Sequence, residues 1–240
     1  KPTGMWSRME TGLIRQSQDK NRRDNTLLAG LACTSPDSNC FCTSLGSGPF
    51  DTEGLDLLFI DLGNKFLVRS ASKNGEAFIS EHKVLFKEAT DEAEAADKLQ
   101  EKTEKAMHRK VDVEKLPEKL KTLFDDPVWG DLAQTCVGCY ACTYLCPTCH
   151  CFDIQDEKRG TKGRRIRVWD SCSNPEYTAH ASGYNPRPGR KNRMRNRILH
   201  KYQYYPDNFG VIACVGCGRC IDNCPVSNDL VESLKDLGGR

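Results

Sequence analysis

The stretches CVGCYACTYLCP at 136–147 and CVGCGRCIDNCP at 214–225 have the same cysteine spacing, and this repeat decides the fold. Each reads C-x2-C-x2-C-x3-C-P, the run with which bacterial ferredoxins bind four-iron clusters. Three thiolates at two-residue intervals on a tight loop can meet three corners of one cubane, so its fourth iron needs a distant cysteine. In two-cluster ferredoxins the other run supplies that cysteine. The repeat therefore predicts two [4Fe-4S] clusters.

This exchange of the fourth cysteine assigns all eight ligands. The first predicted cluster is bound by Cys136, Cys139, Cys142 and Cys224. The second is bound by Cys214, Cys217, Cys220 and Cys146. A pair of zinc ribbons is the alternative, but zinc uses two C-x2-C pairs per ion and does not need a third cysteine two residues on.

The first run continues into CTYLCPTCHCFD at 142–153, which also fits two other sites. Cys146 to His150 match C-x2-C-H, the attachment pattern of a c-type haem, and Cys146 with Cys149 matches a thioredoxin-like C-x2-C. Both matches need Cys146, which the four-cysteine run already uses. We therefore interpret both as accidents of overlap.

The composition supports ligation rather than disulfide bonding. Eleven of the fourteen cysteines fall within 136–224, most of them two or three residues apart, whereas disulfide scaffolds are small secreted domains. The net charge of +2 identifies no partner. No apolar run approaches the ~18 residues of a membrane helix, and the first 25 residues lack an apolar signal core. We expect a cytoplasmic protein without a membrane span.

Along the chain, the pattern predicts an α+β domain at 1–125 and a cysteine-rich domain at 126–240. In the first domain, TLLAGLAC at 26–33 predicts a strand. Two further strands within 55–72 are predicted to join at Gly63-Asn64, and 87–108 is rich in helix formers. Pro117 is typical of the first turn of another helix.

The insertion between the two runs, 152–210, is basic. Thirteen Lys and Arg stand against Asp170 and Glu176 between Lys158 and Lys201. It could dock an acidic partner or the phosphates of a flavin or nicotinamide cofactor on a neighbouring subunit, or be a solvated face. Nucleic acid is a less favoured partner, although tyrosines lie among the charges.

Six cysteines lie outside the two runs, and the segments SNCFCTS and CHCFD share a C-x-C-F pattern. They could form a third metal or iron-sulfur cluster site, or be buried free thiols. The first choices for this site are Cys33, Cys42, Cys151 and Cys172, with Cys40 and Cys149 as further candidates.

The chain resembles a 4Fe-4S dicluster subunit family in four segments: NRRDNTLLAGLACTSPDSNCFCTSLGSGP, CYACTYLCPTCHCFDIQDE, VWDSCSNPEYTAHASGYNPRP and RMRNRILHKYQYYPDNFGVIACVGCGRCIDNCPV. Among its members are the beta subunit of cytoplasmic sulfhydrogenase-type nickel-iron hydrogenases and one of the subunits of anaerobic sulfite reductase. The resemblance covers most of 20–235. It implies a ferredoxin-like domain of the alpha-helical ferredoxin type, with the eight motif cysteines as ligands. Because family members carry about a hundred further residues upstream, we expect the N-terminal domain to be incomplete.

The leading hypothesis is a non-catalytic electron relay between a subunit that binds flavin and NAD(P)H and a catalytic subunit, in a soluble anaerobic complex of the hydrogenase or sulfite reductase type. The sequence has no P-loop, complete G-x-G-x-x-G or H-E-x-x-H, so we predict no nucleotide site and no catalytic residue in this chain. Two alternatives stay open: a sulfur-compound reductase that uses a third cluster, and a nucleic-acid-binding protein with structural clusters.

Overall fold

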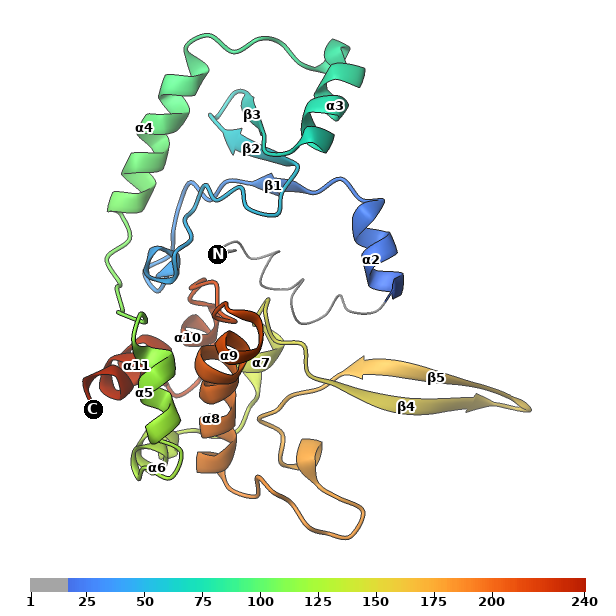
Figure 1. The fold of residues 1–240 in the computed structure, drawn as a ribbon, viewed down its shortest axis with the longest axis vertical. Coiled ribbons are helices and arrows are strands. Elements are labelled where there is room, and N and C mark those ends of the chain that lie inside the picture. The colour runs from blue at the N-terminus through green and yellow to red at the C-terminus, as the bar shows by residue number, and fades with distance from the viewer. Residues whose placement is uncertain (1–16) are drawn as a thin grey trace. The chain divides into compact units, whose positions relative to one another are not determined.

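The structure is a computed structural model that describes residues 17–240. The chain divides into two compact units (Figure 1). The first comprises the described residues up to Lys110 together with 214–218, and the second comprises 111–213 and 219–240. The expectation that the chain lacks a signal core concerns its first 25 residues, most of which lie outside the described part.

A three-stranded sheet of order β1-β2-β3 forms the centre of the first unit. β1 (Ala29–Leu31) pairs parallel to β2 (Leu57–Asp61), and β2 pairs antiparallel to β3 (Phe66–Ser70). The strand predicted at 26–33 and the hairpin predicted around Gly63-Asn64 are confirmed, with Gly63 at a φ of 96° in the turn. The hydrophobic core beside the sheet consists of Ala32, Phe50, Leu58, Ile60, Leu67 and Ala96.

Three helices belong to this unit: α2 (Ser17–Asp24), α3 (Lys73–Glu81) and α4 (Glu92–Lys105). α4 confirms the helix predicted within 87–108, and Glu94–Lys98 and Glu101–Lys105 form i,i+4 ion pairs on its surface. Two 3-10 turns, η1 (Cys42–Leu45) and η2 (Lys83–Leu85), complete the unit.

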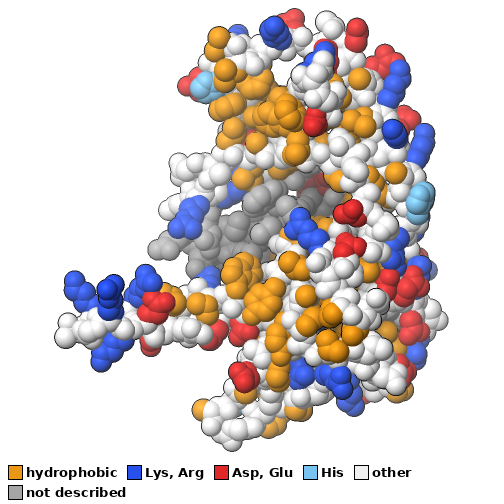
Figure 2. Space-filling view, turned by 180° about the vertical axis from the view of Figure 1, so that it is seen from behind, with side chains coloured by type: hydrophobic (Ala, Val, Ile, Leu, Met, Phe, Trp, Pro, Cys, Tyr) orange, Lys and Arg blue, Asp and Glu red, His pale blue; other side chains and the backbone are white. Residues whose placement is uncertain are grey.

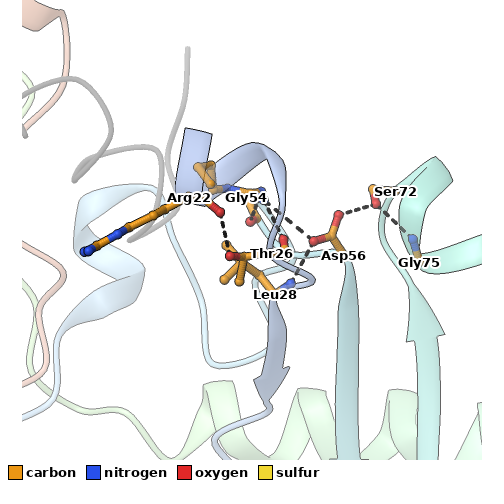
Figure 3. A network of polar contacts seen from close by, with 8 residues as sticks. Arg22, Thr26, Leu28, Gly54, Asp56, Ser72 and Gly75 are labelled. Carbon is orange, nitrogen blue, oxygen red and sulfur yellow. Dashed lines mark hydrogen bonds and ion pairs between the residues drawn. The ribbon is translucent and has the colours of Figure 1, made fainter. Parts of the chain in front are cut away.

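The buried carboxylate of Asp56, 2% exposed, ties the start of β2 to its neighbours (Figure 3). It accepts hydrogen bonds from the Leu28 amide at 2.8 Å and the Ser72 hydroxyl at 2.6 Å, and Arg23 lies 3.8 Å away. Ser72 in turn caps α3 by accepting from the Gly75 amide at 3.2 Å. Burial alone would raise the pKa of Asp56, but these partners hold it below its ordinary value.

The second unit is mainly helical. It contains α5 (Leu116–Thr122) and α6 (Val128–Ala133). α5 confirms the helix predicted at Pro117. α8 (Arg190–Leu199) packs on α6, and α11 (Leu230–Gly239) packs on α5. Fully buried side chains from these helices form its core, including Leu116, Leu120, Trp129, Ile198, Leu199 and Leu234.

A π-helical turn, η4 (His200–Tyr204), joins α8 to α9 (Tyr205–Phe209). Pro206 has no N–H for the carbonyl four residues before it, and the Tyr205 amide bonds to His200, five residues back. Two one-turn helices, α7 (Ala141–Tyr144) and α10 (Arg219–Asp222), lie within the two cysteine runs, and η3 (Pro175–Thr178) lies in the insertion.

The insertion opens with an exposed hairpin of β4 (Phe152–Arg159) and β5 (Lys162–Trp169), paired antiparallel from Phe152↔Trp169 to Arg159↔Lys162. Every residue of β4 is exposed, and Lys and Arg side chains gather along the hairpin (Figure 2). The described chain is thus mixed α and β, with two small sheets.

In the described part of the chain, no helix has the length and apolar character needed to cross a membrane.

Candidate metal centre

Four cysteines of the second unit line one pocket. They are Cys136, Cys139, Cys142 and Cys224, the set predicted for the first cluster. Cys220, predicted for the second cluster, lines the same pocket. Apolar side chains such as Ile198, Val226 and Leu230 also line it, together with arginines of α8 that include Arg197. A pocket with several thiols and apolar walls suits an iron-sulfur cluster, which binds through thiolates and needs little other polar contact.

The backbone of the first run turns sharply to present its cysteines. Gly138 and Tyr140 both adopt left-handed conformations, with φ of 70° and 64°. Tyr140 precedes the one-turn helix α7, which carries Cys142. In the same pocket, the backbone amide of Asn228 donates to the sulfur of Cys224 at 3.2 Å. Such amide-to-sulfur bonds stabilise negative charge on a cluster ligand.

Arg197 of α8 lies buried beside these thiols, 6% exposed. It donates to the Cys142 carbonyl at 3.2 Å, while its Nε has no hydrogen-bond partner among the described residues. No carboxylate of residues 17–240 forms an ion pair with it. Burial would lower the pKa of this guanidinium, but the nearby thiols, Cys142 and Cys220 foremost, raise it well above its usual value. A buried cation with an orphaned donor fits a site built for a negatively charged group.

The second run begins in the first unit, which contains Cys214 and Cys217. There the Phe41 amide donates to the Gly216 carbonyl at 2.8 Å, and the Gly216 amide contacts the Cys214 sulfur at 3.5 Å. Gly216 has a φ of 64°, and a Cβ on it would lie 2.5 Å from the Cys42 amide nitrogen. The loop thus needs glycine for its backbone conformation and for its close packing.

Cys146, the last cysteine of the first run, has a buried lysine beside it. Lys201 is 2% exposed, and its Nζ lies 3.1 Å from the Cys146 sulfur. The same ammonium donates to Thr148 Oγ1 at 2.9 Å and to the Ala213 carbonyl at 2.8 Å. A hydrogen bond from Cys149 and the charge of Lys201 lower the pKa of the Cys146 thiol, against the effect of burial. These interactions favour the thiolate form of Cys146, which is the form that binds iron.

Three of the six remaining cysteines, Cys149, Cys151 and Cys172, line a second cavity of this unit. Cys33, Cys40 and Cys42 belong to the first unit. There the Cys42 sulfur lies 3.5 Å from the Met107 sulfur, and burial raises the Cys42 pKa to about 11. Cys40 contacts the Cys217 carbonyl at 3.8 Å.

The sequence-based predictions give no individual role to Arg193, Arg197 or Lys201. They treat these residues only as part of the positive charge of the insertion. All three are buried. They recur at every fourth residue and so share one face of a continuous helical segment, a signal that could have separated them from the exposed charges. Arg193 donates to the Pro188 carbonyl at 2.7 Å and braces the loop before α8.

In the described part of the chain, no group of three or more His, Cys, Asp or Glu side chains is arranged to hold a single metal ion.

Comparison with known proteins gives one family and one relative. Residues 135–228 match the family described as a 4Fe-4S dicluster domain. Sulfhydrogenase 2 subunit beta of Pyrococcus furiosus is 36% identical over 220 residues, which are 91% of this chain and 65% of that protein. The chain thus spans about two thirds of the length of this relative. No solved structure matches the chain.

Proposed function

We propose that this chain, which matches a 4Fe-4S dicluster domain over residues 135–228 and is similar to a sulfhydrogenase beta subunit, carries two [4Fe-4S] clusters and relays electrons between two partner subunits. The single observation that carries the proposal is the pocket on which the four cysteines of one predicted cluster converge. We assign that pocket to Cys136, Cys139, Cys142 and Cys224. We assign the other cluster to Cys214, Cys217, Cys220 and Cys146.

A bound [4Fe-4S] cluster supplies one-electron oxidation and reduction. The residues around each site set the conditions for that chemistry. Arg197 and Lys201 are buried cations next to cluster ligands, and they favour the reduced, more negative state. The Asn228 amide acts in the same direction at Cys224. In this proposal the cysteine-rich part, 126–240, is a domain of the alpha-helical ferredoxin type, and 1–125 is a separate α+β domain.

We further propose that the two electron-transfer partners, within a cytoplasmic complex, are a catalytic redox subunit and one that binds flavin and NAD(P)H. The relative is a sulfhydrogenase subunit by name, which supports a complex of this class. The β4–β5 hairpin is a suitable docking arm, because an isolated two-stranded ladder is marginally stable and gains from a partner surface. Between residues 152 and 169 it carries six Lys and Arg against three acidic residues, so its partner surface should be acidic.

Iron analysis and EPR of the full chain, purified anaerobically, test the cluster assignment. Cys139→Ser and Cys217→Ser each remove one predicted ligand from a different site. Each variant should lose one EPR signal of the reduced protein and about four irons per chain. Retention of both signals and of all iron in both variants would contradict the proposal. Co-purification of the tagged chain from its native source should yield the two partner subunits in equal amounts.

A further inference from the structure

A second cavity of the second unit has three thiols on its wall. Cys149, Cys151 and Cys172 line a space of about 260 Å³ in which none of the eight motif cysteines takes part. A water molecule occupies about 30 Å³ of liquid, so the space is larger than a single ion and its ligands require. The cavity therefore fits a cofactor of several atoms.

The base of the hairpin brings these cysteines together from the segments before β4 and after β5. Cys151 precedes β4, and its carbonyl accepts from the Asp170 amide at 3.0 Å, which continues the ladder beyond Trp169. This pairing sets Cys151 beside Cys172, and both side chains line the cavity. Ser171, between Asp170 and Cys172, is fully buried and bonds to Thr143 Oγ1 at 2.6 Å. The wall is thus a fixed part of the fold.

The charges around the cavity favour an anionic occupant. Arg187, Arg197 and Lys201 line it with the thiols, and the other lining residues include no Asp or Glu. The imidazoles of His150 and His200 also line it, with ring centroids 5.6 Å apart. A cluster bound by thiolates carries net negative charge and satisfies these cations.

From these observations we infer that Cys149, Cys151 and Cys172 bind a third [4Fe-4S] cluster in this cavity. One of the two imidazoles would bind the fourth iron, since histidine replaces cysteine as a ligand in some clusters. Cys149 is three residues from Cys146, a predicted ligand of the second cluster, so the third cluster would lie close to the second. If the proposed relay is correct, one electron passes between these two clusters, and one is oxidised as the other is reduced.

The test compares the full chain with two variants, all reconstituted anaerobically with ferrous iron and sulfide. The first is Cys149→Ser/Cys151→Ser/Cys172→Ser. The matched control is Cys33→Ser/Cys42→Ser, which replaces two cysteines of the first unit. We expect about twelve irons and twelve sulfides per wild-type chain, about eight in the triple variant and about twelve in the control. Far-UV circular dichroism and the EPR signals of the two motif clusters verify that the triple variant is folded.

Four results would overturn the inference. Two concern iron: the same iron content in the wild type and the triple variant, or the same loss of iron in the control as in the triple variant. The others are the loss of one zinc instead of four irons, and a Cys151–Cys172 disulfide found by mass spectrometry after alkylation. Cys172→Ala alone provides a second, milder variant if the triple variant misfolds, and it too should lose about four irons. Failure of the proposed two-cluster assignment is distinguishable, because it appears as retained iron in Cys139→Ser and Cys217→Ser.

Discussion

Lys201 is only 2% exposed and places a positive charge 3.1 Å from the sulfur of Cys146. A charge at that distance stabilises the reduced state of a cluster bound by Cys146 and therefore raises its reduction potential. Lys201→Met keeps most of the apolar stem but removes the charge. We expect this potential to fall by on the order of 100 mV, as measured by redox titration monitored by EPR.

Lys191→Met is the matched control, because Lys191 is an exposed lysine of the same helical segment. Solvent and salt screen its charge, so its removal should leave both potentials nearly unchanged. Equal potentials in Lys201→Met and the wild type would show that Lys201 does not act on the cluster.

Gly138 and Gly216 occupy the same position in the two cysteine runs, and both have positive φ. A Cβ on Gly138 would meet only the Tyr140 ring, at 3.7 Å, whereas on Gly216 it would collide with the Cys42 backbone. Alanine costs about 1 kcal/mol for the left-handed backbone at either position. Only Gly216→Ala must also displace its neighbour, so it should lose about four irons per chain, while Gly138→Ala keeps them. Identical iron contents would contradict this interpretation of the loop.

At the scale of elements, Asp56 joins the start of β1, the start of β2 and the N-terminus of α3. Its folded pKa is lowered, so its contribution to stability is present above its unfolded pKa of about 3.9 and is lost as the pH falls through the folded value. Asp56→Asn should lower the free energy of unfolding by about 2 to 3 kcal/mol at pH 7. The deficit should shrink below about pH 4.

Urea unfolding of the iron-free chain, followed by circular dichroism between pH 7 and pH 3, measures this difference without interference from acid-labile clusters. Asp61→Asn is the control in the same strand, because Asp61 is exposed and bonds only to the turn, at Gly63, 2.7 Å away. It should cost less than about 1 kcal/mol at every pH. A deficit of Asp56→Asn that does not change with pH would refute the linkage.

The β4–β5 hairpin is the element whose role depends on a partner. Lys158→Glu/Arg159→Glu/Lys162→Glu reverses three charges at its tip. With an acidic partner surface, we expect association to slow ten- to a hundredfold at low salt, roughly the scale of electrostatic steering. The same reversal at three exposed lysines of α4, Lys98, Lys102 and Lys105, should have little effect. Surface plasmon resonance against the purified partner subunits, at several salt concentrations, compares the association rates of the hairpin variant and the α4 variant.

Across the whole molecule, the sequence predicts what is local and misses what long-range packing creates. The cysteine runs, the turn at Gly63 and the helix start at Pro117 are readable because neighbouring residues determine them. Whether Arg197 or Lys201 faces solvent depends on α5, α6 and the π-helical turn, which no short pattern encodes. For the same reason, the sequence does not show which of the six extra cysteines lie together. The structure places Cys149, Cys151 and Cys172 on the wall of one cavity.

The buried cations also couple the clusters to the stability of the whole chain. Without clusters, the charges of Arg197 and Lys201 stay buried beside thiols instead of anionic cofactors, which is costly. Removing the iron with a chelator should therefore lower the free energy of unfolding by several kcal/mol. In Arg197→Met/Lys201→Met this loss should be smaller by about 3 kcal/mol, because the buried positive charges that interact with the clusters are absent.

Guanidinium titrations of the cluster-loaded and iron-free forms measure the loss of unfolding free energy in the wild type and in the double variant. The control is Lys191→Met/Lys235→Met, which replaces two exposed lysines. The control should show the full wild-type loss. An equal loss in all three proteins would show that the clusters do not stabilise the buried cations. The partners of these cations within the protein would then already stabilise them.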